Sequence, residues 1–219
     1  MLGCFFIFRS FDFCILRYIN TQINMKVQGI FIIGLFCCIS CEAQIPNKEA
    51  QLAMAVQAAP EDKRDGATVY GYDENGELVL LKEGTNELIC LSDDPNSKGL
   101  NIACYHQDLE AFMARGRELR AAGKSRSEIF DIREEEAKSG ALKMPENPST
   151  LHVLSGPDGL YNADSMRVEN ANYRYVVYIP FATPESTGLP IRPMVPGGPW
   201  IMDPGTHKAH IMITPPPKN

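Results

Sequence analysis

The order of β-rich and helical segments constrains the fold of this chain more than any other feature of its sequence. Strand-like runs at 67–72 and 78–82 flank the turn 73–76, in which Asn75-Gly76 supplies the positive-φ positions of a tight hairpin. A third short strand is expected at 87–91. We therefore expect the ordered part of the chain to begin with a β-hairpin and one further strand.

Two consecutive helices are expected next. Residues 108–122 repeat apolar side chains such as Phe112 at helical spacing. Ser125-x-x-Glu128 matches a capping box, which predicts a second helix over 125–139. The basic stretch Arg115 to Arg126 also carries Glu118 and is interpreted as a solvated helix face.

The last third of the chain consists of short β-rich runs that proline and glycine separate, at 150–154, 173–179, 200–202 and 209–213. Strands, then two helices, then strands predict an α+β domain with a mainly antiparallel sheet, two central helices and long Pro/Gly-rich loops. We expect a single globular domain over 66–214. A lead-in or linker at 44–65 precedes it, and a tail at 215–219 follows it.

The region before this domain has the pattern of an export signal. Lys26 follows Met25, the uncharged apolar run 29–39 comes next, and residues 40–43 close the segment. The apolar run is shorter than the roughly 20 residues of a membrane-spanning helix. We therefore expect 25–43 to be a signal peptide and the protein to be exported, to the periplasm or the extracellular space.

Two alternatives remain open around this signal. Residues 1–24 are apolar but interrupted by charges, so they are either a non-native extension from an upstream start codon or a short N-terminal membrane segment. At the other end, cleavage after Ala43 releases a soluble protein. Lipidation of Cys41 instead gives a lipoprotein that is anchored to the membrane.

Export also accounts for the cysteines. The chain has seven, and five of them lie in or before the signal, so cleavage after Ala43 leaves only Cys90 and Cys104. An even pair in an exported chain predicts a disulfide. The closed loop of about 15 residues contributes roughly 3 kcal/mol in the chain-entropy model.

Composition excludes several classes of function. The formal net charge is −6 and the basic residues are dispersed, which argues against a nucleic-acid partner. Ala122-Gly123-Lys124-Ser125 resembles the end of a phosphate-binding loop, but a helix precedes it and the first glycine of that motif is missing. We expect no cofactor, and the two domain cysteines alone do not complete a metal shell.

His207 and His210 are the candidate chemical groups, because neutral imidazoles are metal ligands and bases near pH 7. Three residues apart on a strand, they face opposite sides, so we expect no metal site unless a turn intervenes. His210 remains a candidate general base. Trp200 and Tyr175 are candidate binding residues in an apolar cleft, although Tyr175 also fits a core face.

The C-terminal third resembles the ending of a family of small uncharacterised bacterial exported proteins. The shared pieces are the run 197–200 (GGPW), Gly205-Thr206 and the segment 209–212 (AHIM). The resemblance implies that His210 belongs to the family pattern and His207 does not, and it implies no activity. We expect an exported module that binds a small molecule or an envelope partner. A hydrolase-like enzyme that uses His210 as general base is the alternative, and we expect membrane contact only through the signal or a lipid anchor.

Overall fold

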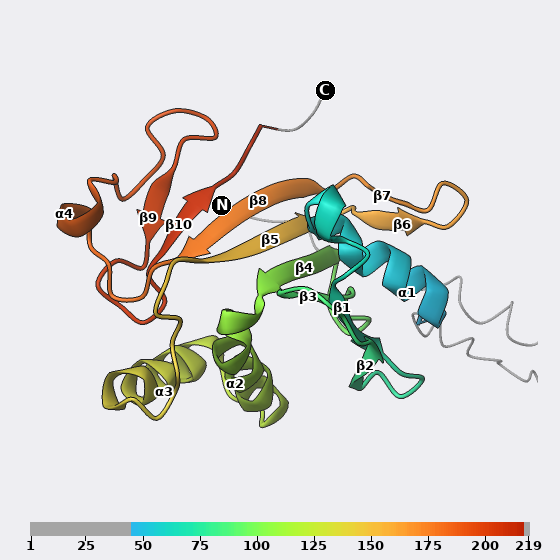
Figure 1. The fold of residues 1–219 in the computed structure, drawn as a ribbon, viewed down its shortest axis with the longest axis horizontal. Helices are drawn as coiled ribbons and strands as arrows, with labels where there is room; N and C mark the ends of the chain where they lie inside the picture. The colour runs from blue at the N-terminus through green and yellow to red at the C-terminus, as the bar shows by residue number, and fades with distance from the viewer. Residues whose placement is uncertain (1–44, 217–219) are drawn as a thin grey trace, which may run out of the picture. The chain divides into compact units, whose positions relative to one another are not determined.

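The computed structural model describes residues 45–216. They form an α+β fold around an eight-stranded sheet with the strand order β2-β1-β3-β4-β5-β8-β10-β9 (Figure 1). Neighbouring strands are antiparallel except β1 and β3, which are parallel. The strands of this sheet are β1 (Thr68–Tyr72), β2 (Leu78–Lys82), β3 (Leu88–Leu91), β4 (Leu100–His106), β5 (Ser149–Gly156), β8 (Asn172–Tyr178), β9 (Trp200–Met202) and β10 (His210–Ile213).

The remaining elements are short helices and one separate hairpin. The helices are α1 (Lys48–Ala55), α2 (Glu110–Ala121), α3 (Arg126–Ser139) and α4 (Pro184–Thr187), together with the 3₁₀ turns η1 (Val56–Ala58), η2 (Glu61–Lys63) and η3 (Gln107–Leu109). β6 (Leu160–Asn162) pairs with β7 (Arg167–Glu169). The expected α+β class, with two central helices and a mainly antiparallel sheet, is confirmed.

Local sequence signals account for several of these elements. The hairpin of β1 and β2 turns at Gly76, whose φ of 76° is easily adopted only without a Cβ. The capping box at the start of α3 is present in full, because Ser125 accepts a hydrogen bond from the amide of Glu128 and the Glu128 carboxylate accepts one from the amide of Ser125. Gly140 ends α3 with a φ of 79°.

The segment 44–65 is not the loose lead-in that the sequence suggested. Its described residues form α1, η1 and η2, and Met54 and Ala55 are buried in the main core. Gln51 is 3% exposed, and its side-chain amide exchanges hydrogen bonds with the backbone of Tyr72 at 2.7 and 2.9 Å. The expectation failed because most of the buried apolar residues here are alanines, whose contribution appears only when α1 and η1 are packed against the sheet.

Side chains alternate between the two faces of the sheet and build two separate cores. On one face, α1 and η1 cover a cluster that includes Ala58, Val69, Leu88, Cys90, Ile102, Cys104 and Leu154. On the other face, η3 and α2 contribute Leu109 and Phe112 to a cluster with Tyr105, Leu142, Val176 and Tyr178. In Figure 1, α2 and α3 lie below the sheet and α1 lies at its right.

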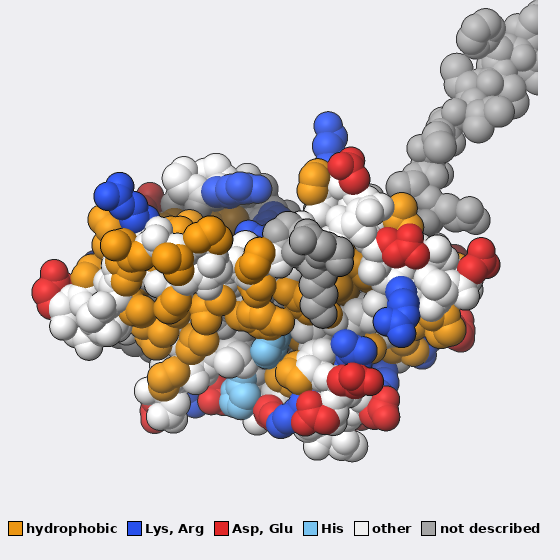
Figure 2. All heavy atoms as spheres, turned by 90° about the horizontal axis from the view of Figure 1, so that it is seen from above, with side chains coloured by type: hydrophobic (Ala, Val, Ile, Leu, Met, Phe, Trp, Pro, Cys, Tyr) orange, Lys and Arg blue, Asp and Glu red, His pale blue; other side chains and the backbone are white. Residues whose placement is uncertain are grey.

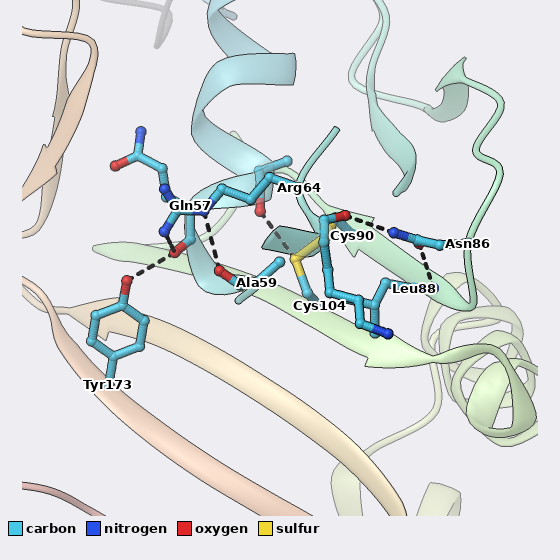
Figure 3. The surroundings of a disulfide bond; sticks show 10 residues. Gln57, Ala59, Arg64, Asn86, Leu88, Cys90, Cys104 and Tyr173 are labelled. Carbon is cyan, nitrogen blue, oxygen red and sulfur yellow. Dashed lines mark hydrogen bonds between the residues drawn. A yellow bond between two sulfur atoms is a disulfide. The ribbon is translucent and has the colours of Figure 1, made fainter. Parts of the chain in front are cut away.

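The expected disulfide is confirmed. Cys90 of β3 lies directly opposite Cys104 of β4 in the antiparallel register, with their Cα atoms 4.0 Å apart. Both residues are fully buried, and Figure 3 shows the bridge lying against the turn that follows α1. The Tyr173 hydroxyl donates a hydrogen bond to the Gln57 carbonyl at 2.8 Å, so β8 is joined to the same turn.

Three strands had not been expected from the sequence. β4 is a central strand between β3 and β5, and β6 and β7 form a separate hairpin in the connection from β5 to β8. The hydropathy of β4 alternates only weakly along the strand. Ala103 and Cys104 are both small and apolar although they face opposite sides of the sheet, so the sequence gives little sign of a strand here. No helix within 45–216 has the length and apolar character of a membrane span. The predicted signal, its alternatives and Cys41 lie outside the described residues.

Candidate functional site

His210, the candidate general base, is a buried structural residue of β10. It is 4% exposed, and its Nδ1 lies 2.7 Å from the Lys208 carbonyl oxygen, to which it donates in the tautomer that satisfies this contact. Its ring packs against Tyr178 at 5.2 Å between centroids. Burial lowers its pKa. Within 45–216, no hydroxyl or carboxylate is hydrogen-bonded to the His210 ring, so the arrangement of a catalytic triad is missing from this position.

Trp200, His210 and Tyr175 do not converge on one site. Met212 pairs with Trp200 on one side and with Val176 on the other, so Trp200 and His210 point to the sheet face that carries α2. Tyr175 is adjacent to Val176 along β8 and therefore points to the opposite face, where it is 37% exposed. The binding site expected from these three residues is thus divided by the sheet.

His207 lies in the turn before β10 and binds Glu134 of α3. It is fully buried, and both its backbone amide (2.8 Å) and its Nδ1 (2.5 Å) contact the Glu134 carboxylate. Although burial disfavours the carboxylate, hydrogen bonds from Lys138 and His207 lower the pKa of Glu134 to about 2. No group of three or more potential metal ligands occurs within 45–216.

The α2 side of the sheet carries an unexpected site, which we call the arginine groove, and His210 is the one of the three candidate residues that lines it. It is a cavity of about 450 Å³ between the sheet and the two helices α2 and α3, a size within the range of small-molecule pockets. Its apolar surface is formed by Leu91, Ala103, Leu151, Val153, Val176 and Met212 from the sheet and by Phe112, Met113 and Ile129 from the helices.

The charges of the arginine groove are all of one sign. Five cationic side chains line it and no carboxylate does: Arg117, Arg120, Arg133, Arg174 and Lys208. Two of the five have acidic partners nearby, because Arg117 binds Glu110 at 2.7 Å and Lys208 binds Asp203 at 3.1 Å. The other three make no ion pair with a carboxylate of residues 45–216. In a chain of net charge −6, this concentration of positive charge is local to the groove.

Arg133 is the most constrained of the three unpaired arginines. Its guanidinium lies over the Phe112 ring, 4.0 Å from the centroid, and its Nη1 donates to the Phe112 carbonyl at 3.1 Å. Its Nε is buried with no hydrogen-bond partner in 45–216. Burial lowers the pKa of Arg133, but not enough to make an arginine neutral near pH 7. A fixed, incompletely satisfied guanidinium is a preorganised site for an anion.

Arg117 is held by a second polar network at the same wall. Its Nη1 donates to the Tyr105 hydroxyl at 3.0 Å, and that hydroxyl donates to the Glu110 carboxylate at 2.5 Å. Burial raises the pKa of Tyr105, and the hydrogen bond to Glu110 acts in the same direction. The phenol therefore stays protonated near pH 7 and positions both charged partners.

The arginine groove continues along the sheet into a second cavity of about 620 Å³. The two cavities share Leu91, Asn101, Ala103, Arg117 and Arg120. The second cavity is more mixed in charge, because Glu77 and Asp94 line it. It also contains Ser92, which is 3% exposed and whose hydroxyl has no hydrogen-bond partner in 45–216. A ligand that extends from the first cavity into the second meets a buried hydroxyl there.

Sequence reasoning missed this site for an identifiable reason. The stretch from Arg115 to Arg126 was interpreted as a solvated face, and Arg115 does bind Glu118 and Glu136 at the surface. Arg117 and Arg120 line the groove, although Arg120 is also exposed to solvent, as the sequence indicated. Helical phase distinguishes these positions, but Arg174 and Arg133 come from distant parts of the chain. Only the packing of α2 and α3 beneath the sheet brings these four arginines together.

Comparisons of the chain with known protein families, functionally characterised proteins and solved structures found no match. The resemblance to a family of exported proteins therefore stays a prediction, and the geometry of the arginine groove is the basis for assigning a function.

Proposed function

We propose that this domain is an exported binding module whose arginine groove takes a small anionic ligand with an apolar body. The observation that carries the proposal is the lining of the groove, where cationic groups surround an apolar floor and no carboxylate opposes them. Export is supported by the signal-like segment and by the Cys90–Cys104 disulfide, since such bonds persist in oxidising compartments.

The shape of the groove restricts the ligand further. Arg174 lies beside Val153 in the register of β5 and β8, so a cationic group and an apolar side chain are neighbours on the same floor. An inorganic anion gains nothing from the apolar surface. A neutral apolar molecule leaves the guanidinium groups of Arg120, Arg133 and Arg174 without an anionic partner. A carboxylate, sulfonate or phosphate attached to an apolar chain or ring satisfies both parts of the lining.

The hydrolase alternative has less support. His210 lines the arginine groove, but it is only 4% exposed and its ring contacts a backbone carbonyl, so it lacks the hydroxyl partner that a general base in such an enzyme needs. A binding module requires neither feature. The groove supplies positive charge and apolar surface, which together bind an anion without transforming it.

The proposal is tested with anilinonaphthalene sulfonate, an anionic fluorophore with an apolar body, displaced by decanoate or by uncharged decanol. We expect decanoate to displace the fluorophore far more effectively than decanol. The Arg120→Gln/Arg174→Gln variant should bind decanoate about tenfold more weakly, because both arginines are exposed and an exposed ion pair contributes roughly 0.2–1 kcal/mol.

The matched control is Arg167→Gln, which removes an exposed arginine of β7 outside the groove. It should leave decanoate affinity unchanged. Equal displacement by decanol and decanoate contradicts the proposal, and so does a double variant that binds decanoate like the wild type. Circular dichroism and thermal unfolding of each variant establish that the fold is retained.

A further inference from the structure

The segment between α4 and β9 exposes an unusual amount of apolar surface. Ile191 is 64% exposed, Met194 77% and Val195 62%, which makes them the three most exposed large hydrophobic side chains of residues 45–216. Figure 2 shows hydrophobic side chains gathered on the upper side of the molecule, toward the end that holds β9, β10 and this segment. Exposed apolar groups concentrated in one short run indicate a surface that is covered in use. We call residues 189–199 the proline loop.

The composition of the proline loop fits a lipid environment. Four of its eleven residues are proline, at 190, 193, 196 and 199. Proline has no amide hydrogen, so these positions carry no donor that has to be desolvated on entering an apolar medium. Two backbone donors at this end of the fold are already satisfied, because Gly198 donates to the Val195 carbonyl and Ile201 to the Pro190 carbonyl, both at 2.9 Å.

The charge of the proline loop points the same way. No carboxylate occurs between Glu185 and Asp203, although the whole chain has a net charge of −6. The loop carries one charge, Arg192, which is exposed and forms no ion pair with a carboxylate of residues 45–216. A single arginine beside exposed apolar side chains is suited to reach a phosphate at the bilayer surface while those side chains enter the interface.

We propose that the proline loop inserts Ile191, Met194 and Val195 into the interface of a phospholipid bilayer. This contact is additional to the membrane attachment expected from the signal or a lipid anchor, and it does not depend on the arginine groove. A lipid surface fits better than a protein partner, because insertion uses apolar side chains and a donor-poor backbone without requiring a complementary groove. A second copy of the chain is the main competing occupant, and the experiment separates the two.

The chain reports on this contact through its one tryptophan, Trp200, which follows the loop directly. The full-length protein is mixed with phosphatidylcholine vesicles and with vesicles whose acyl chains are brominated close to the headgroup. We expect a blue shift of Trp200 emission on the unbrominated vesicles and quenching on the brominated ones. Binding of other parts of the chain is separated by the loop variant below, which leaves those parts unchanged.

The decisive variant is Ile191→Ser/Met194→Ser. It should weaken vesicle partitioning of the loop about 100-fold, with about tenfold lost for each exposed apolar side chain removed. The matched control is Met166→Ser, which removes a methionine of similar exposure, 61%, from the turn between β6 and β7. It should leave the Trp200 signal intact.

Three results overturn the proposal. One is unchanged Trp200 emission at saturating vesicle concentration. Another is a double variant that keeps the full signal. The third is a dimer of the wild type in sedimentation velocity that the double variant abolishes while vesicles have no effect, because the loop is then covered by a second copy of the chain.

Discussion

The Cys90–Cys104 bridge gives the sharpest stability prediction. It joins two residues that are 14 positions apart in sequence. The closed loop contains the end of β3, the connection to β4 and the first half of β4. Cross-linking a loop of this length removes about 10 cal/mol/K of entropy from the unfolded chain, which corresponds to about 3 kcal/mol at 25 °C. Reduction of the wild type should therefore lower its free energy of unfolding by about 3 kcal/mol. Both sulfurs stay in the core, so their packing changes little.

The measurement is equilibrium unfolding in urea, with and without reductant, followed by far-ultraviolet circular dichroism. The control is Cys90→Ala/Cys104→Ala, whose unfolding should not respond to reductant. Because Cys90 and Cys104 are bonded to each other, thiol reagents should label neither of them in the unreduced protein, even after it is denatured. The reasoning would be refuted if the oxidised and reduced wild type had free energies of unfolding within about 0.5 kcal/mol of each other, because the loop-entropy model predicts a much larger difference.

Two further contacts predict measurable losses. Gln51→Ala leaves the amide and carbonyl of Tyr72 without partners inside a packed region and should cost about 2–3 kcal/mol in urea unfolding. An unchanged free energy of unfolding would show that water replaces both bonds. Glu134→Ala removes the partner of buried His207 and should cost about 3 kcal/mol at pH 7, whereas Glu135→Ala, an exposed neighbour, should cost less than about 0.5 kcal/mol. The pKa of Glu134 is lowered to about 2, so its carboxylate stabilises the fold above its usual pKa near 4.5, and this contribution is lost as the pH falls toward 2. Between pH 4.5 and 2, the free energy of unfolding should therefore depend less steeply on pH in Glu134→Ala than in the wild type. Equal slopes in the two proteins would contradict the assignment.

The elements with strong local signals were predictable. The turn at Gly76 and the capping box at Ser125 each depend on residues within a few positions of one another, so their geometry can be inferred from spacing alone. β4 was missed because its neighbours on both sides determine which of its residues are buried. α1 and η1 were missed as core elements because alanines such as Ala55 and Ala58 carry a weak hydrophobic signal until they are packed against the sheet.

The candidate site was less predictable than the fold. Trp200, His210 and Tyr175 were selected for their chemistry, but the period of a strand places Tyr175 on the other face of the sheet. Arg174 also belongs to β8 and attracted no notice, because a single arginine in a strand carries no signal by itself. Its importance follows from Arg120 and Arg133, which reach the same groove from two helices.

The sequence by itself determined the fold class and the pairing of the only two cysteines in the predicted mature domain, because both follow from order, composition and short-range pattern. It also contained the proline loop in full, since that segment is continuous. Tertiary structure alone decided which face of the sheet each side chain occupies and which arginines meet. Strand alternation converts a shift of one residue into a change of face, and a groove exists only after helices and strands from distant parts of the chain have packed.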